Sequence, residues 1–112
     1  MKKVYEVKID ILDFGLFHLK FRNSLFLRPS EDLRPGILIR LMEFEPITEY
    51  LTGRNIIVEL VNIDKREHFI CGEQVWFCEL KFINTPPAPL ERFYETQRAV
   101  PSRVPGLNGG SQ

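Results

Sequence analysis

The sequence predicts a single, mainly β domain of the α+β class. Two apolar runs, residues 37–44 and 56–63, are rich in β-branched side chains, which fit a pleated, half-buried surface. Each run is about eight residues long, which is the length of a strand rather than a helix. A polar connection with Pro46 near its start and turn residues at 52–55 separates the runs, so they predict a long-looped β-hairpin. Because both runs are apolar on both faces, they belong in the middle of a sheet or in a closed barrel.

The first strand is expected over residues 4–11, where apolar and polar side chains alternate. Tyr5, Val7 and Ile9 fall on one face of such a strand, and Glu6 and Lys8 fall on the other. This period of two is typical of a strand with one buried and one solvated face.

Residues 12–21 fit two different structures. Phe14, Phe17 and Phe21 recur at helical spacing, and Asp10 or Asp13 stands where a helix N-cap is needed. Residues 17–21 also alternate as a strand would, and the glycine at 15 costs a helix about 1 kcal/mol relative to alanine. The pattern alone leaves helix and strand open. Residues 24–28 then form a short strand that a proline ends.

The later part of the chain predicts a turn and a last strand. Residues 64–68 are all polar or charged, so we expect a turn there, followed by a bulge at Gly72. In residues 74–83, Trp76 and Cys78 face inward, whereas Glu79 and Lys81 face solvent. This alternation predicts the last strand.

The chain divides into a domain at residues 1–84 and a C-terminal extension at residues 85–112. The extension holds five of the eight prolines and three of the seven glycines. Because proline cannot donate the hydrogen bonds of a strand, we expect the extension to be irregular. A segment of this kind is suited to lie along a protein partner or to mediate self-association.

Cysteine spacing and hydropathy argue against several kinds of site. Cys71 and Cys78 are seven residues apart and have no histidine at metal-ligand spacing, so we expect no metal site and two small buried or reduced thiols. No cofactor-binding motif is found. No apolar run approaches 18 residues, and the N-terminus lacks an apolar signal segment, so we expect no membrane association and a cytoplasmic location.

The charge is balanced but unevenly distributed. Fifteen Lys+Arg and fifteen Asp+Glu give a net charge of zero, which argues against a strongly basic nucleic-acid binder. Residues 1–40 hold eight basic and five acidic side chains, whereas residues 41–84 hold four and eight. One face of the domain can therefore still be basic, and the alternative is ordinary solvated charge.

The hairpin resembles that of a known family. Its members, a small bacterial and phage family within the ASCH/PUA-like superfamily, carry a V-G-D-x-L-x-L-x-E-x-D-P segment and then a Y-T-G-R turn. The matching residues here are Gly36, Leu38, Glu43, Pro46, Tyr50, Thr52, Gly53 and Arg54. The resemblance extends over about residues 4–84. It implies a PUA-like pseudo-barrel of five to six strands with one short helix after the first strand, and it favours a helix within residues 12–21.

The resemblance also implies a function. PUA-like domains mostly bind RNA, so we expect non-catalytic binding of RNA or another nucleic acid. ASCH amidohydrolases use the lysine and threonine of a G-x-K-T segment, which falls here on residues 21–24, where only Ser24 keeps a hydroxyl. The missing lysine argues against catalysis. The alternatives are a protein-interaction subunit, phage-encoded and located in the virion, that uses residues 85–112, and a small hydrolase acting on a modified nucleoside.

Basic residues of the helix, the short strand and the following loop are candidates for binding nucleic acid. Arg28 matches an arginine of the family and can grip a phosphate or a base edge bidentately, and the alternative is an ion pair with Glu31 or Asp32. Lysines and arginines beside aromatic rings can follow a nucleic-acid backbone. The candidate residues are Lys20, Arg22, Asn23, Ser24, Arg28, Arg34 and Arg54.

Two further side chains have competing interpretations. Trp76 is either a stacking platform or a core residue, and its place on an alternating strand favours the core. His18 lies among apolar residues, which favours a packed histidine over a general base, because a base needs a positioned partner.

Overall fold

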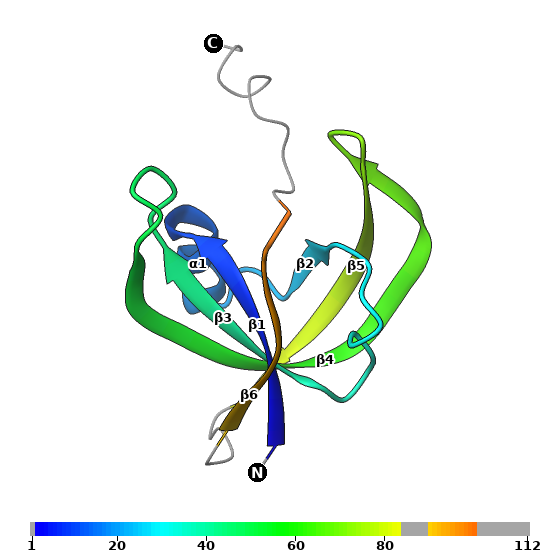
Figure 1. The fold of residues 1–112 in the computed structure, drawn as a ribbon, viewed down its shortest axis with the longest axis horizontal. Coiled ribbons are helices and arrows are strands. Elements are labelled where there is room, and N and C mark those ends of the chain that lie inside the picture. The colour runs from blue at the N-terminus through cyan, green and yellow to red at the C-terminus, as the bar shows by residue number, and fades with distance from the viewer. Residues whose placement is uncertain (1, 84–89, 101–112) are drawn as a thin grey trace.

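A computed structural model describes residues 2–83 and 90–100 and shows six strands and one helix (Figure 1). In chain order the elements are β1 (Lys2–Asp10), α1 (Ile11–His18), β2 (Ser24–Leu27), β3 (Leu38–Phe44), β4 (Leu51–Ile70), β5 (Glu73–Phe82) and β6 (Leu90–Arg98). The expectation of a mainly β chain with one short helix after the first strand is confirmed. The predicted hairpin is also confirmed, since β3 and β4 pair antiparallel.

The strands form one mixed sheet in the order β2-β5-β4-β3-β1-β6. β1 pairs in parallel with β3 and β6, and the other ladders are antiparallel. The sheet is not closed into a barrel, in contrast to the barrel-like arrangement expected. Among the described residues, a single bridge between Phe26 and Val100 links the two edges. β2 is only four residues long and Pro29 follows soon after it, so it cannot form a longer ladder with the opposite edge.

Residues 11–18 are helical because the helix buries two aromatic rings. Phe14 and Phe17 lie about one helical turn apart, so both rings point to the same side and join the main core cluster. In a strand, residues three apart point to opposite faces, and only one of the two rings could be buried there. α1 packs against β1 and β3. Asp10 stands at the N-cap position, although its side chain makes no capping hydrogen bond. The ambiguity in the pattern is thus resolved by burial of these rings.

The expectation that one face of β1 is solvated is wrong for Glu6. This residue is only 1% exposed, because β1 has neighbours on both edges and Arg40 of β3 and Thr96 of β6 both reach its carboxylate. Tyr5, Val7 and Ile9 line the main core on the opposite face, as predicted.

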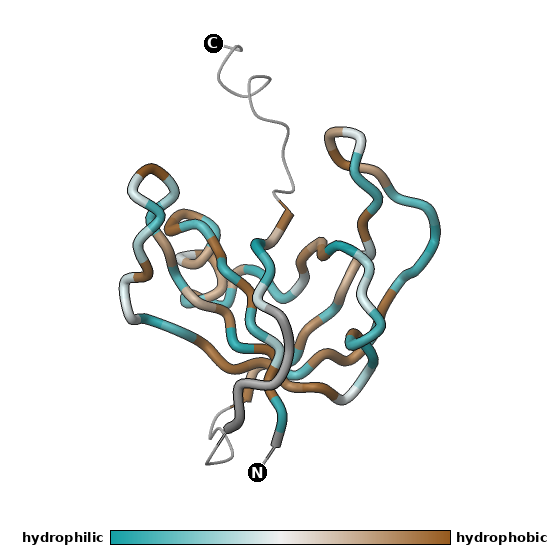
Figure 2. Tube along the Cα trace, in the orientation of Figure 1, coloured by the Kyte–Doolittle hydropathy of each residue, from teal (hydrophilic) through white to brown (hydrophobic). Residues whose placement is uncertain are grey.

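The predicted turn at residues 64–68 is wrong, because β4 continues to Ile70. The chain instead reverses at Cys71 and Gly72, whose φ angles of 53° and 82° are both positive, as a tight hairpin turn requires. The polar residues lie along a hairpin arm that extends from the sheet, where the outer part of β4 is hydrophilic (Figure 2). Cys71 is a free thiol exposed at the tip, so of the two expected alternatives it is not a buried side chain. Cys78 is buried, and burial raises the pKa of its thiol to about 12.

The C-terminal extension is not irregular throughout, because residues 90–98 form β6 beside β1 (Figure 1). The proline-rich residues 84–89 and residues 101–112 lie outside the described part of the chain. Gln97 and Thr96 of β6 donate hydrogen bonds to Tyr5 and Glu6 of β1. Proline composition therefore misled the prediction for the segment between the prolines. Within the described ranges, no helix is long and apolar enough to cross a membrane.

We predict that β6 contributes to stability. A chain that ends at Val100 keeps every described contact. A chain that ends at Ile83 loses Thr96, one partner of the buried Glu6 carboxylate, and exposes the edge of β1. Removing a partner of a buried polar group costs about 1–3 kcal/mol. We therefore expect the free energy of unfolding in urea to fall by at least about 2 kcal/mol for the shorter chain only. Equal stability of the two truncated chains would contradict this role.

Candidate nucleic-acid interface

A basic groove lies where the segment after α1 meets the end of β5. Its larger part is a cavity of about 540 Å³. The lining includes Lys20, Phe21, Arg22, Asn23, Lys81 and Phe82. A second hollow of about 280 Å³ shares Lys20 and Phe82 and adds His18 and Ile56. We refer to the two together as the basic groove.

The end of α1 turns the chain so that an aromatic ring projects from the groove. Lys20 takes a positive φ of 62°, and its N–H donates to the carbonyl of Phe17 at 3.0 Å. The N–H of Phe21 then bonds to the carbonyl of Leu16 at 2.9 Å, which closes the helix end. Phe21 is left 79% exposed. The carbonyl of Asn23 accepts from the N–H of Leu80 at 2.8 Å and ties this turn to β5.

The groove is cationic because none of its lining residues is acidic. Lys20 and Lys81 are exposed, and the Lys20 ammonium lies 5.8 Å from the centre of the Phe82 ring. Arg22 is more constrained. It lies over the Phe17 ring at 5.4 Å, donates from Nε to the carbonyl of Ser24 at 2.9 Å, and lies 3.6 Å from Asp13. The two lysines are therefore the cations most available to a ligand.

Three of the seven candidate residues, Lys20, Arg22 and Asn23, line this groove together. Ser24 follows directly as the first residue of β2, half-buried opposite Glu79 of β5. The other three candidates, Arg28, Arg34 and Arg54, do not line the groove.

Arg28 holds the end of β2 in place. Its Nε and Nη2 donate to the two carboxylate oxygens of Glu73 at 2.9 and 3.2 Å, and its Nη1 donates to the carbonyl of Arg98 at 2.9 Å. The partner is therefore Glu73 of β5, and neither Glu31 nor Asp32 as proposed from the sequence. The pKa of Glu73 is lowered, mainly by the hydrogen bonds from Arg28 and to a smaller extent by the positive charge of Arg28. Arg28 thus connects three strands and is not free to grip a ligand.

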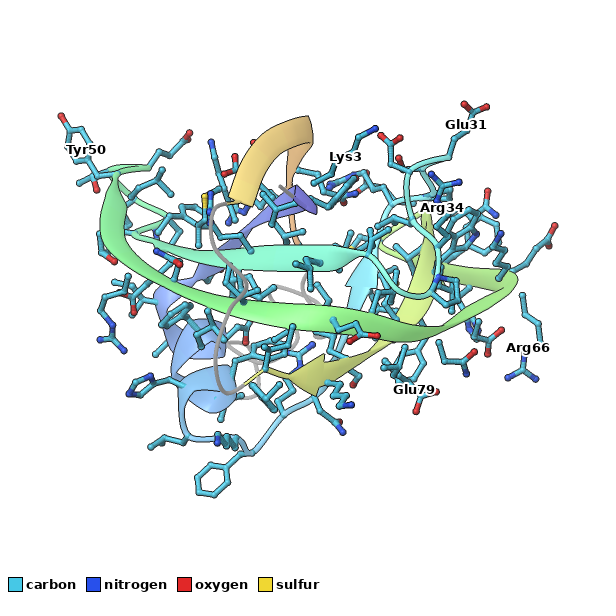
Figure 3. The ribbon with its side chains drawn as sticks, turned by 90° about the horizontal axis from the view of Figure 1, so that it is seen from below. Lys3, Glu31, Arg34, Tyr50, Arg66 and Glu79 are labelled. Carbon is cyan, nitrogen blue, oxygen red and sulfur yellow. The ribbon has the colours of Figure 1, made fainter. Side chains whose placement is uncertain are left out.

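Arg34 and Arg54 lie in other parts of the surface. Arg34 projects from the loop between β2 and β3, and its side chain has no hydrogen bond or ion pair among the described residues (Figure 3). Arg54, near the start of β4, lies 3.6 Å from the Glu43 carboxylate and over the Phe14 ring at 5.2 Å.

Sequence reasoning missed several members of the groove, among them Phe21, Lys81 and Phe82. Alternation in residues 74–83 placed Lys81 of β5 on the solvent-facing side of the strand. No local signal showed that this side lies next to the end of α1. Phe21 was assigned to an apolar stripe, whereas the helix ends three residues before it. A helix boundary at His18 would have identified the ring as exposed.

The described residues show no catalytic arrangement around Ser24 or His18. Within the described ranges, Arg22 donates a hydrogen bond to the backbone carbonyl of Ser24 and not to its hydroxyl. His18 is exposed and stacks on Phe14 with the ring centres 6.4 Å apart, so it is not the packed histidine that was expected. Trp76 packs against the core, as expected, and the Lys65 ammonium lies 4.8 Å from its ring centre. No group of three potential metal ligands occurs within the described ranges.

Comparisons with known proteins gave no match, either to a protein-family model or to a curated protein. The interpretation of the site therefore depends on its geometry and on the resemblance of the hairpin.

We predict that the Arg28–Glu73 pair stabilises the fold in a pH-dependent way. The pKa of Glu73 is lower in the folded chain than its ordinary value of 4.5, so the stabilisation is present above that value and is lost as the pH falls through the lowered pKa. Wild type should be more stable than Glu73→Gln at pH 7, and the difference should shrink at pH 3 in urea denaturation. In an Arg28→Ala background the substitution should have no pH-dependent effect. A difference that is constant with pH would contradict this assignment.

Proposed function

We propose that this protein is a non-catalytic RNA-binding domain that holds a single-stranded segment in the basic groove. The observation that carries the proposal is the convergence of Lys20, Lys81 and the exposed ring of Phe21 in a groove without acidic lining residues. Lysines placed along a groove neutralise phosphates, and an exposed ring offers a stacking surface to any unpaired base.

The preference for a single strand follows from the exposed ring of Phe21. A base must leave the helical stack to lie on an aromatic ring, which is easy in a single strand and costly in a duplex. Asn23 adds an exposed amide beside Phe21 that can donate to and accept from a base edge. Because only a few cations line the groove, binding should be of modest affinity and should weaken with salt.

The order of elements supports placing the chain in the ASCH/PUA-like superfamily. A strand, a short helix, a short strand and then a long hairpin follow one another as in that superfamily, and the hairpin carries the resembling Tyr50 and Thr52-Gly53-Arg54 motif. We infer RNA, rather than DNA, as the ligand from this resemblance. A bacterial or phage setting, in the cytoplasm or the virion, belongs to the same proposal.

We predict that the two groove lysines carry the electrostatic part of binding. In fluorescence anisotropy with a labelled single-stranded RNA, Lys20→Ala/Lys81→Ala should reduce the slope of log affinity against log salt by about 1.4, since each phosphate contact to a single strand contributes about 0.7. The matched control is Lys65→Ala, which removes a lysine from the distal hairpin arm near Arg66 (Figure 3). Equal effects of the two proteins, or no binding by wild type at low salt, would overturn the proposed interface.

We predict that Phe21 stacks on a base. Stacking contributes about 1–3 kcal/mol per base, so Phe21→Ala should weaken RNA binding by about fivefold to a hundredfold without changing the salt slope. Phe21→Tyr keeps a ring and should bind normally. Phe69→Ala is a control of the same chemistry, because Phe69 is also an exposed ring but lies at the tip of the arm. Loss of binding in Phe69→Ala with normal binding in Phe21→Ala would move the interface to the arm.

A further inference from the structure

A second cavity, of about 350 Å³, lies between β1, β3 and the start of β4. Its lining includes Glu6, Arg40, Met42, Glu43, Leu51 and Asn55. We call it the charged cavity. Asn55 lines it, whereas the next residue, Ile56, lines the basic groove, and successive strand residues point to opposite faces. The two sites are therefore separate.

The charged cavity presents an unused carboxylate oxygen. Glu43 is 6% exposed, and its Oε1 accepts from Thr52 Oγ1 at 2.6 Å and lies 3.6 Å from Arg54 Nε. Its second oxygen, Oε2, has no hydrogen-bond partner among the described residues. Every fully buried side-chain nitrogen or oxygen of the described residues does have one, so Glu43 Oε2 must be accessible from the cavity. A buried carboxylate with one accessible oxygen is a strong hydrogen-bond acceptor.

The cavity also presents unused donors. Arg40 is half-buried and uses Nη1 to bind Glu6 at 2.9 Å, which leaves its other guanidinium N–H groups without a protein partner among the described residues. The side-chain amide of Asn55 likewise makes no hydrogen bond within the described part of the chain, and it offers both a donor and an acceptor. Donors and acceptors thus lie around one cavity.

Charge balance restricts the ligand that this cavity can hold. Glu6 and Glu43 are matched by Arg40 and Arg54, so the lining is neutral overall. An anion such as phosphate would be repelled by the two carboxylates, and an organic cation by the two arginines. Met42 and Leu51 supply an apolar wall. These features favour an uncharged, flat and polar molecule.

We propose that the charged cavity binds an uncharged planar heterocycle of the nucleobase type, presenting an N–H donor beside an acceptor. Carboxylate, guanidinium and carboxamide side chains are the groups that recognise the edges of such rings. The volume lies within the range of about 300–1,000 Å³ usual for small-molecule sites. This site does not depend on RNA binding in the basic groove.

The test is a titration of the ¹⁵N-labelled full chain, followed by two-dimensional NMR. The probes are guanosine, cytidine, adenosine and uridine, with inorganic phosphate and putrescine as charged comparison molecules. At least one nucleoside should cause saturable shifts at residues 40–43 and 53–55, and the charged molecules should not. The shifts should persist in Lys20→Ala/Lys81→Ala, which separates this proposal from the proposed function.

Two substitutions locate the site within the cavity. In Glu43→Gln the amide oxygen can keep the bond from Thr52, so an amide donor replaces the acceptor that faces the cavity, and affinity should fall about tenfold or more. Asn55→Ala alters an exposed side chain without disturbing the core and should weaken binding by about twofold to tenfold. No saturable binding of any nucleoside, tighter binding of phosphate or putrescine, or unchanged affinity in both variants would overturn the proposal.

Discussion

The fold depends on one buried carboxylate, that of Glu6, in the middle of the sheet. An ionised carboxylate that is taken out of water is strongly destabilising unless it is paired and hydrogen-bonded. Glu6 meets this requirement with Arg40, opposite it on β3, and Thr96, opposite it on β6. A shift of either neighbour by one residue would turn that neighbour's side chain to the other face and remove one partner of the charge. The carboxylate therefore defines the register of three parallel strands at once.

This register determines where the distant parts of the chain meet. With Thr96 beside Glu6, the next residue, Gln97, lies beside Val7 and reaches the Tyr5 hydroxyl at 2.7 Å, while it accepts from the N–H of Arg28 at 3.1 Å. β6 is thereby connected to the end of β2, and the bridge from Phe26 to Val100 continues the contact. At its other end, β2 starts with Ser24, which directly follows the groove residues 20–23. The register around Glu6 thus brings β6 into contact with the end of β2 that lies opposite to the groove residues.

Local pattern was sufficient for most strands but not for the neighbours that surround them. Alternation and β-branched runs predicted β1, β3, β5 and the hairpin, because each depends on residues close in sequence. Alternation identified the two faces of β1 correctly, but it could not show that Glu6 would be covered, since the covering residue Thr96 is 90 residues away. Residues 64–68 illustrate the converse. They are strand residues whose side chains face solvent on an extended arm, so polarity there indicated exposure and not a turn. Lys20, Arg22 and Asn23 were among the seven predicted residues and lie close in sequence, whereas Lys81 joins them only through β5.

A protein without net charge can still present a cationic groove, because its arginines and lysines are used differently. Arginines 22, 28, 40, 54, 66 and 98 each pair with a carboxylate within the described ranges. The planar guanidinium suits such fixed pairs, whereas the lysine ammonium is strongly hydrated and stays in water. Lys20 and Lys81 accordingly form no ion pair within the described ranges, and both line the groove. Six carboxylates are thus paired with arginines among the described residues, whereas the two groove lysines stay unpaired next to an exposed ring. The net charge of zero therefore does not describe the face that a ligand would meet.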